Sequence, residues 1–250
     1  MINDNLIAVI IPVHNSASTI RAAIDSVIAQ THPSQIYLID DASSDDLSSA
    51  IRPYMELPFF HLIVNETNKG VAQSRMKGVE AAENAEYIAF LDADDWWDEN
   101  KLKEQLLLMQ EKNAVLSSCG RELMDPEGKS TGRIIGIPET IDRHLILRTN
   151  PLNCSGVMVK RNVMLEYPMD HDDAHEDYIS WIRIITSYGS AAGLDKPYLK
   201  YRLTPAGKSR NKLHSAAMHY RSYRYVGFSR IKSLSLMLSY AIYGIRKYYL

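Results

Sequence analysis

The sequence predicts an α/β protein with one mostly parallel, Rossmann-like sheet that helices flank. Three observations lead to this prediction. Through residues 1–118, short apolar segments alternate with segments whose apolar residues recur at helical spacing. Acidic or polar residues follow several of the apolar segments, as they do at the carboxyl edge of an open α/β sheet. At 250 residues and 46% hydrophobic content, the chain is long enough to bury a large core.

The first elements follow from this alternation. We expect a strand at 6–11, because this run is apolar and rich in β-branched residues, and Pro12 ends it. A helix is expected at about 20–28, where apolar residues recur at intervals of three and four. The second strand is expected at 36–39 and leads into an acidic segment, after which a second helix runs until Pro58.

The alternation continues beyond that helix. Strands expected at 60–64 and 87–91 enclose a polar loop and a helix over 71–82. Another helix leads to a short strand at 114–117. The periodicity then weakens, and the Gly and Pro residues within 121–138 predict a hairpin or a flexible loop.

Cysteine content and the N-terminus indicate a cytoplasmic protein. Cys119 and Cys154 lie far apart and lack C-x-x-C spacing, so they predict neither a disulfide framework nor a metal cluster. The chain begins without a basic segment, and the apolar run 6–13 is too short to span a bilayer. Both observations fit a reducing compartment.

The net charge of −2 hides a strong asymmetry. No Asp or Glu occurs after Asp195, whereas twelve Lys and Arg residues do, and residues 1–195 hold 16 basic and 30 acidic side chains. A basic tail on an acidic body predicts that the tail meets an anionic surface such as phospholipid. The acidic body argues against nucleic acid as a partner.

The C-terminal segment combines Tyr and Arg residues with an apolar stripe at helical spacing. The stripe consists of Ile231, Leu234, Leu238, Ile242, Ile245 and Tyr249. Such a helix either lies in the interface of an anionic membrane or docks on the protein's own core. The abundance of Tyr and Arg favours the membrane.

An acidic cluster follows the strand expected at 87–91, where Asp92, Asp94 and Asp95 place three carboxylates within four residues. Like charges this close oppose each other's ionisation unless a hard cation or several donors compensate them. A divalent cation that holds a phosphate would compensate them. The alternative is a solvated turn whose acids cap the next helix.

Polar motifs follow the expected strands in a specific order. They are Pro12-Val13-His14-Asn15, Asp40-Asp41-Ala42-Ser43, Asn68-Lys69-Gly70 with Arg75, and Asp92-Ala93-Asp94-Asp95, and beyond the first half of the chain His175-Glu176-Asp177-Tyr178. This order resembles family 2 of the glycosyltransferases over residues 7–202, which implies the GT-A fold. No G-x-G-x-x-G follows the first strand, which argues against a nicotinamide-binding protein.

The resemblance implies a UDP-sugar donor. In the family, the residues matching Pro12, His14 and Asp41, with Asn15 beside them, line the uracil pocket. A carboxylate there accepts from the ring N–H of the base, and a flat side chain stacks on it. Arg75 would contact the nucleotide or pyrophosphate, together with the N-terminus of the helix that carries it.

The resemblance also implies a metal ion. Asp92 would face the ribose, and Asp94 and Asp95 would bind Mg²⁺ or Mn²⁺ bridging the diphosphate. Spacing alone leaves open which of Asp94 and Asp95 is the main ligand.

The acidic motif of the second half implies the catalytic base. Asp177 matches it, with Glu176 as its neighbour and His175 placed to orient the acceptor or contact a phosphate. On a helix, the two carboxylates point about 100° apart, so only one faces the sugar. The alternative is a helix cap.

The resemblance divides the chain into a nucleotide-sugar half (1–118), an acceptor and catalytic-base half of the same domain (119–205), and a basic, Tyr-rich loop and helix (206–250). Within the last segment, residues 206–212 would close over the donor. It implies an inverting transfer of a hexose or N-acetylhexosamine. With the basic tail, it predicts a lipid-diphosphate-linked saccharide acceptor, as in O-antigen or capsule synthesis at the cytoplasmic face of the inner membrane. Two alternatives are a transferase that loads polyprenyl phosphate directly and a non-catalytic nucleotide-sugar-binding partner of a synthase.

Overall fold

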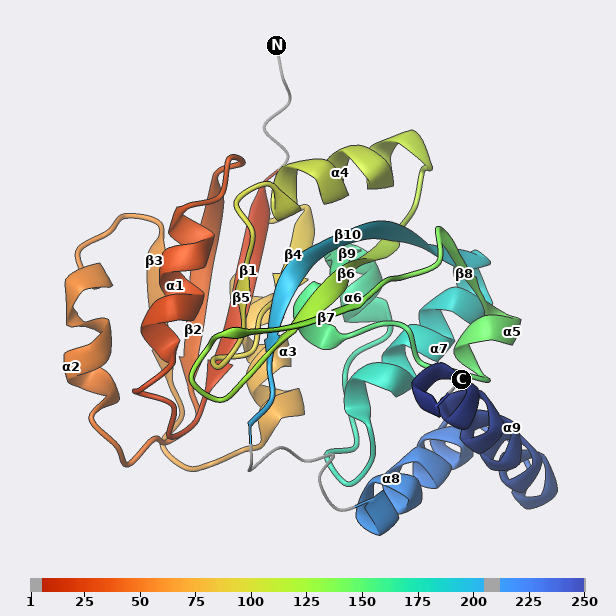
Figure 1. Ribbon diagram of the computed structural model, residues 1–250. Coiled ribbons are helices and arrows are strands. Elements are labelled where there is room, and N and C mark those ends of the chain that lie inside the picture. Colours follow the sequence, from red (N-terminus) through yellow and green to blue (C-terminus); the bar gives the residue numbers. More distant parts are fainter. Residues whose placement is uncertain (1–5, 205–211, 250) are drawn as a thin grey trace.

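The structure, a computed structural model, describes residues 6–204 and 212–249, with side chains as far as Ala241 except that of Lys212. Ten strands form one sheet with helices on both faces, as the sequence predicts (Figure 1). The strand order is β3-β2-β1-β4-β9-β6-β10-β5, with β7 beside β6 and β8 beside β10. The α/β class with a C-terminal helical segment is therefore confirmed.

The first half of the chain forms the parallel part of the sheet. Its strands are β1 (Ile7–Val13), β2 (Ser34–Asp40), β3 (Phe60–Val64) and β4 (Tyr87–Phe90). Its helices are α1 (Ile20–Ile28), α2 (Leu47–Ile51), α3 (Val71–Ala81) and α4 (Lys101–Glu111), with a 3₁₀ turn at Arg52–Tyr54. In β1, Val9 pairs in parallel with Ile36 on one side and with Ala89 on the other.

The strand β1 is apolar throughout because helices cover it on both faces. Ala8 and Ile10 point into a core shared with α3 and α7. Ile7, Val9 and Ile11 point into a second core shared with α1, α2 and α4. All five side chains are fully buried, so the continuous apolar run reflects two cores and not one.

The second half, together with β5 of the first half, adds mostly antiparallel strands. These are β5 (Trp96–Trp97), β6 (Leu116–Met124), β7 (Ser130–Ile135), β8 (Thr140–Asp142), β9 (Met158–Lys160) and β10 (Ser190–Arg202). Its helices are α5 (Arg143–Ile146), α6 (Arg161–Glu166) and α7 (Glu176–Tyr188), with a 3₁₀ turn at Cys154–Gly156. The hairpin expected within 121–138 is formed by β6 and β7. The short β9 pairs with both β4 and β6 and so joins the two halves into one sheet.

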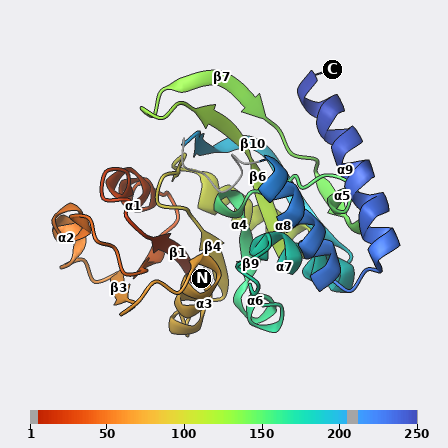
Figure 2. The same cartoon turned by 90° about the horizontal axis from the view of Figure 1, so that it is seen from below.

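The chain ends in two helices, α8 (Lys212–Tyr225) and α9 (Arg230–Tyr249), at the opposite end of the molecule from α2 (Figures 1 and 2). Of the segment expected to close over the donor at 206–212, residues 206–211 lie outside the described residues and Lys212 begins α8. Of the two alternatives for the last helix, docking on the protein core is observed, because Tyr223 and Leu236 are buried in the core shared with α7.

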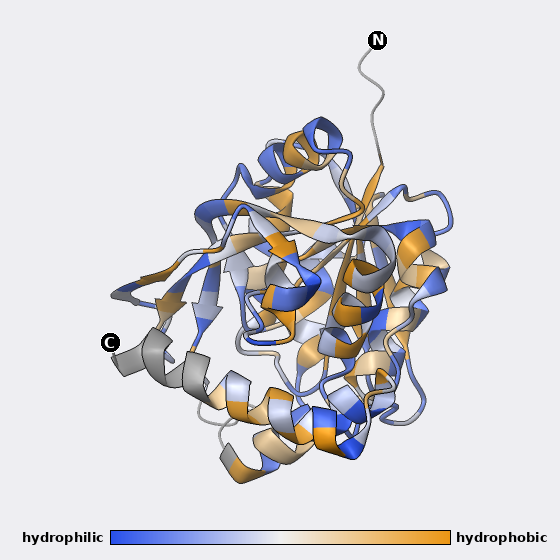
Figure 3. Ribbon diagram, turned by 90° about the vertical axis from the view of Figure 1, so that its right-hand side faces the viewer, coloured by the Kyte–Doolittle hydropathy of each residue, from blue (hydrophilic) through white to orange (hydrophobic). Residues whose placement is uncertain are grey.

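The described residues of the apolar stripe expected on the last helix are exposed, and Figure 3 shows this helix at the surface of the molecule. Ile231, Leu234 and Leu238 are 83%, 61% and 66% exposed, so the core contact uses a different face of α9. The helices of the described part of the chain include none long and apolar enough to pass through a membrane.

Candidate active site

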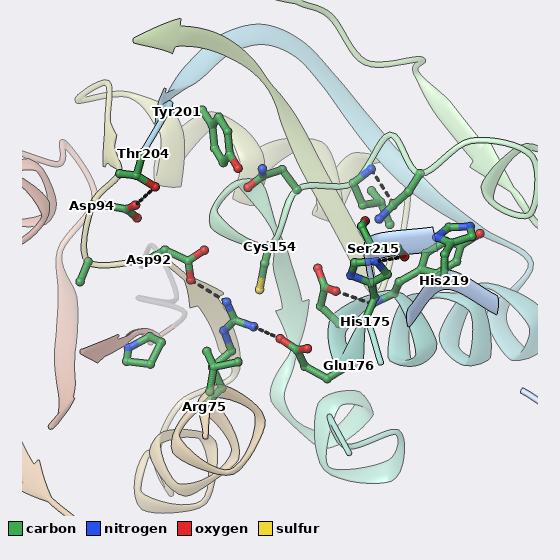
Figure 4. A pocket seen from close by; sticks show the side chains of 18 of the residues that line it. Arg75, Asp92, Asp94, Cys154, His175, Glu176, Tyr201, Thr204, Ser215 and His219 are labelled. Atoms are coloured by element: carbon green, nitrogen blue, oxygen red, sulfur yellow. Dashed lines mark hydrogen bonds and ion pairs between the residues drawn. The ribbon is translucent and has the colours of Figure 1, made fainter. Parts of the chain in front are cut away.

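A cavity of about 820 Å³ lies where the carboxyl ends of β1 and β4 meet the start of α7 (Figure 4). Pro12 and His14 line it from the end of β1, and Asp92 and Asp94 from the segment after β4. Because parallel strands present their carboxyl ends at one edge, motifs 80 residues apart in sequence meet here. The volume lies within the roughly 300–1,000 Å³ of ligand-binding pockets.

Arg75 connects the two halves of the site. On α3, its Nη2 donates to Asp92 Oδ1 at 2.6 Å and its Nη1 donates to Glu176 Oε1 at 2.9 Å (Figure 4). The Arg75 and Glu176 side chains are 5% and 8% exposed, whereas that of Asp92 is 34% exposed. A charged pair with so little solvent is held rigidly, so Arg75 fixes α7 relative to the acidic cluster.

The carboxylates of the acidic cluster have different environments. Asp94 lines the cavity, and its Oδ2 accepts from Thr204 Oγ1 at 3.4 Å. Asp95 is 1% exposed and is not among the residues that line the cavity; its Oδ1 accepts from the Arg202 N–H at 2.9 Å. Burial, followed by the charge of Asp92, raises the pKa of Asp94 and raises that of Asp95 well above its usual range. Ionising both carboxyl groups is therefore unfavourable without a further positive charge beside them.

This donor set fits a hard divalent cation, because carboxylate oxygens with raised pKa values gain most from a neighbouring positive charge. Within the described residues, however, no group of three or more His, Cys, Asp or Glu side chains is arranged to hold a metal ion. A cation at Asp94 would need further oxygen ligands from outside the protein, such as those of a diphosphate or water.

At the end of β1, Pro12 and His14 line the cavity and Asn15 supports them. His14 Nδ1 lies 2.8 Å from the Asp41 carbonyl oxygen, and Asn15 Oδ1 accepts from the Ser44 N–H at 2.7 Å. Asn15 has φ of 52°, a left-handed conformation that Asn tolerates better than most residues. Asn15 therefore ties the end of β1 to the turn after β2.

Asp41 is 4% exposed and orders the loop before α3. Its Oδ1 accepts from Asn65 Nδ2 and the Lys69 N–H, both at 2.8 Å, and its Oδ2 accepts from the Gly70 N–H at 2.9 Å. Burial by itself would raise the pKa of Asp41, but these hydrogen bonds outweigh it and lower the pKa. Asp41 is thus ionised and engaged with the protein.

The N-terminus of α3 is capped from the second half of the chain. Asp172 Oδ1 accepts from the Ala72 N–H at 3.0 Å, and a Cβ atom at Gly70 would lie 2.5 Å from Asp172 Oδ2. We expected this helix end to offer free N–H groups to a phosphate, and instead a carboxylate of the protein occupies it. The sequence does not predict that Asp172 caps α3, because no local pattern connects it to a helix 100 residues earlier.

The residues at the start of α7 separate into two roles. Glu176 is held in the pair with Arg75, while Asp177 lines the cavity and its Oδ1 accepts from the Tyr178 N–H at 2.7 Å. His175 precedes the helix, and its Nε2 lies 3.3 Å from the Ser215 carbonyl oxygen. The two adjacent carboxylates are therefore directed to different partners, as the helical geometry predicts.

The helices α8 and α9 complete the cavity. The sequence did not predict that these helices contribute to the site. Their residues that line it are Ser215, Ala216, His219, Met237, Tyr240 and Ala241. The sequence indicated an aromatic and basic tail, but no spacing signal relates that tail to the motifs at 12–15, 92–95 and 175–178 that form the rest of the site.

The chain is similar to several known proteins. Residues 8–166 match the family model described as Glycosyl transferase family 2. TuaG of Bacillus subtilis, whose name assigns it to teichuronic acid biosynthesis, is 30% identical over 221 residues, which are 88% of this chain and 87% of TuaG. WfgD of Escherichia coli, named UDP-Glc:alpha-D-GlcNAc-diphosphoundecaprenol beta-1,3-glucosyltransferase, is 28% identical over 98% of this chain and 96% of its own.

Solved structures show the same fold at lower identity. TarS residues 1–349 of Staphylococcus aureus in complex with UDP align with a TM-score of 0.71 at 17% identity, covering 96% of this chain and 72% of that one. The mannosyltransferase PcManGT of Pyrobaculum calidifontis, in complex with GDP-Man and Mn²⁺, aligns with a TM-score of 0.69 at 15% identity, covering 98% and 75%. These likenesses confirm the GT-A fold.

Proposed function

This chain belongs to glycosyl transferase family 2, and on that basis we propose that it transfers a hexose or N-acetylhexosamine from a UDP-sugar, with inversion, to a lipid-diphosphate-linked saccharide. The observation that carries the proposal is the single cavity that runs from the carboxylates Asp92 and Asp94 to the carboxylate Asp177. A transferase needs both ends, one for the leaving diphosphate and one for the acceptor hydroxyl.

The donor end would hold the nucleoside between Pro12, His14 and Asp92. Asp41 is not among the residues that line the cavity and is 4% exposed, but its Oδ2 accepts one hydrogen bond and has room for a second, so we propose that it accepts a ring N–H of uracil. Two relatives are named as users of UDP-Glc, and a structural neighbour was solved with UDP-GlcNAc, which supports a UDP-sugar. The remaining polar contacts of the base would come from the backbone around Asn15.

We assign Mg²⁺ or Mn²⁺ to Asp94, because Asp94 lines the cavity, while Asp95 is buried behind it and would act by holding the Arg202 backbone. A bound divalent cation would balance the charge that develops on the leaving diphosphate. The pair of Arg75 with Asp92 would keep that carboxylate directed toward the nucleoside.

Asp177 would act as the general base. It takes the proton of the acceptor hydroxyl while that oxygen forms its bond to the anomeric carbon of the donor sugar. The bond from the anomeric carbon to the diphosphate breaks with its electron pair remaining on UDP, and attack from the opposite face gives a β linkage from an α-linked donor. Glu176, neutralised by Arg75, would position Asp177 and is not available as a second base.

The acceptor would reach the site from a membrane. WfgD and WfaP are named for a GlcNAc-diphosphoundecaprenol acceptor. On α9, Leu234 and Leu238 are exposed, and the sequence after Asp195 holds twelve Lys and Arg residues and no Asp or Glu, which suits the anionic cytoplasmic face of the inner membrane. We therefore propose that α9 lies on phospholipid as a peripheral contact.

The function is tested by UDP release from a panel of UDP-sugars, with a synthetic lipid-diphosphate-GlcNAc acceptor and with Mn²⁺, Mg²⁺ or EDTA. Release from one donor, stimulated by acceptor and abolished by EDTA, is expected. Asp177→Asn should keep donor binding and lower turnover by about 10²–10⁴-fold. Glu127→Gln, the same chemical change in an exposed turn of the β6–β7 hairpin, is the control. Normal turnover in Asp177→Asn would remove the base assignment, and UDP binding without release would indicate a non-catalytic protein.

The membrane contact is tested by sedimentation with phosphatidylglycerol vesicles. Leu234→Asp with Leu238→Asp should reduce the bound fraction several-fold, because both the apolar contact and the charge complementarity are lost. Leu107→Asp on α4, where Leu107 is 54% exposed, is the matched control. Equal binding of the wild type and the double variant would refute this contact.

A further inference from the structure

We propose that α8 and α9 form the acceptor subsite, with the ring of Tyr240 as the surface on which the acceptor saccharide lies. This inference rests on the proposed function and deepens it, since it assigns the substrate's binding surface to a part of the chain outside the matched residues 8–166.

The position of the two helices in the cavity is the first argument. Ser215 and His219 lie beyond His175 and Glu176, on the side away from Asp92 and Asp94 (Figure 4). A general base must lie between the donor sugar and the acceptor hydroxyl. With the donor diphosphate at Asp94 and the base at Asp177, the far end of the cavity is left for the acceptor.

The chemistry of this end differs from that of the donor end. In the part of the chain that the structure describes, α8 and α9 line the cavity with Tyr240, Met237, Ser215 and small Ala residues and contribute no carboxylate, Lys or Arg. An aromatic ring with apolar and hydroxyl neighbours suits the C–H face and hydroxyl groups of a sugar.

Tyr240 is held in place by a packed aromatic cluster. Its ring centroid lies 3.9 Å from that of His219, which lies 4.7 Å from the stacked ring of Tyr178. Tyr223 Oη lies 3.0 Å from His219 Nε2 and donates to the Leu147 carbonyl oxygen at 2.7 Å. Tyr178 follows Asp177 on α7, so this cluster fixes the distance between the base and the Tyr240 ring before any ligand binds. A preorganised surface loses little entropy on binding.

The geometry of α9 connects this surface to the exposed apolar face. At about 100° per residue, Ala241 lies between Tyr240 and Leu238 around the helix. Ala241 lines the cavity and is exposed, whereas Leu238 is 66% exposed. A saccharide on Tyr240 can therefore extend its lipid over Ala241 toward the leucine face of the same helix.

The inference is tested with a short-chain, water-soluble lipid-diphosphate saccharide, so that membrane binding plays no part. Tyr240→Ala should raise the acceptor KM about tenfold, the effect of losing roughly 1.4 kcal/mol of ring contact. Tyr240→Phe should stay within about twofold of the wild type because the ring remains. The donor KM and the slow release of UDP without acceptor should not change in either variant.

A second variant guards against a folding defect. Ala241→Trp adds bulk at an exposed position and should raise the acceptor KM at least as much, again without affecting the donor. Tyr188→Ala, which removes a Tyr that is 44% exposed at the other end of α7, is the control and should match the wild type.

The outcomes separate the two proposals. The wild type could transfer sugar while Tyr240→Ala and Ala241→Trp both keep its acceptor KM. This result would overturn the acceptor subsite and leave the proposed function standing. An equal rise in donor and acceptor KM would also overturn the acceptor subsite, since α8 and α9 would then contribute to donor binding. A wild type that transfers sugar to no lipid-diphosphate saccharide would overturn the proposed function and this inference with it.

Discussion

Replacing Glu176 with Ala should destabilise the protein strongly, independently of any effect on activity. Glu176 Oε1 accepts from Arg75 Nη1 at 2.9 Å, and the two side chains are 8% and 5% exposed. Removing one partner of a buried pair leaves the other charge without compensation in a medium of low polarity. Asp92 would remain as the partner of Arg75, but its side chain is 34% exposed and so shares its charge with solvent.

The expected loss is about 3–5 kcal/mol, the usual result of breaking a buried ion pair. A domain is stable by about 5–15 kcal/mol, so this loss is a large fraction of the total. With a urea m-value near 3 kcal/mol/M, the unfolding midpoint should fall by about 1 M or more.

The exposed pair of Lys196 and Glu104 provides the control. Its N–O distance of 2.6 Å is shorter, yet its side chains are 51% and 31% exposed. Glu104→Ala should therefore cost less than about 1 kcal/mol. The comparison separates burial from distance as the source of the effect.

Urea unfolding of the ligand-free protein measures both variants, together with the double variant Arg75→Met/Glu176→Ala. The double variant should be less destabilised than the sum of its single changes, because the uncompensated guanidinium is gone. If Glu176→Ala cost no more than Glu104→Ala, the assignment of a buried, structural ion pair at this site would be refuted.

Three further predictions concern stability, each measured by urea unfolding. Asp172→Ala should cost about 1 kcal/mol, because the Ala72 N–H at the start of α3 loses its acceptor; no change would contradict the cap. Burial, reinforced by His175, lowers the pKa of His219 to about 3 from 6.5. The stabilising effect of its neutral form is therefore complete above pH 6.5 and is lost as the pH falls toward 3. Over this range, the free energy of unfolding of the wild type should fall by up to about 1.4 kcal/mol per pH unit relative to that of His219→Gln. Parallel dependence of the two unfolding free energies on pH would refute this. Gly193→Ala should cost about 3 kcal/mol, since the new Cβ would lie 1.9 Å from the Pro138 carbonyl oxygen, and a stable variant would show that β10 can shift.

The parallel half of the fold was predictable because its signals are local. Each of β1 to β4 contains a short apolar run, and buried parallel strands require such runs whatever the rest of the chain does. The polar motifs after these strands meet because parallel strands share one carboxyl edge, so the cavity wall formed by Pro12, His14, Asp92 and Asp94 followed from order alone.

The second half was less predictable for an equally physical reason. The strand β10 spans Ser190–Arg202 and includes Asp195, Lys196 and Pro197, with a register shift against β6 between Leu194 and Leu199. Such a strand lacks the clean alternation that identifies one from sequence. For the stripe on α9, the sequence left open whether it meets a membrane or the protein core, since periodicity gives the faces of a helix and not their partners.

By itself, the sequence determined the α/β class, the order of the motifs and the residue types at the site, because these depend on local periodicity and on the topology of parallel strands. Only the tertiary structure decided how each charge is used. It pairs Arg75 with Glu176 across 101 positions, places Asp172 on the end of α3, buries Asp95 behind Asp94 and brings Tyr240 to the cavity. Contacts between residues this far apart depend on how the two halves and the terminal helices pack, and no local pattern in the chain encodes that packing.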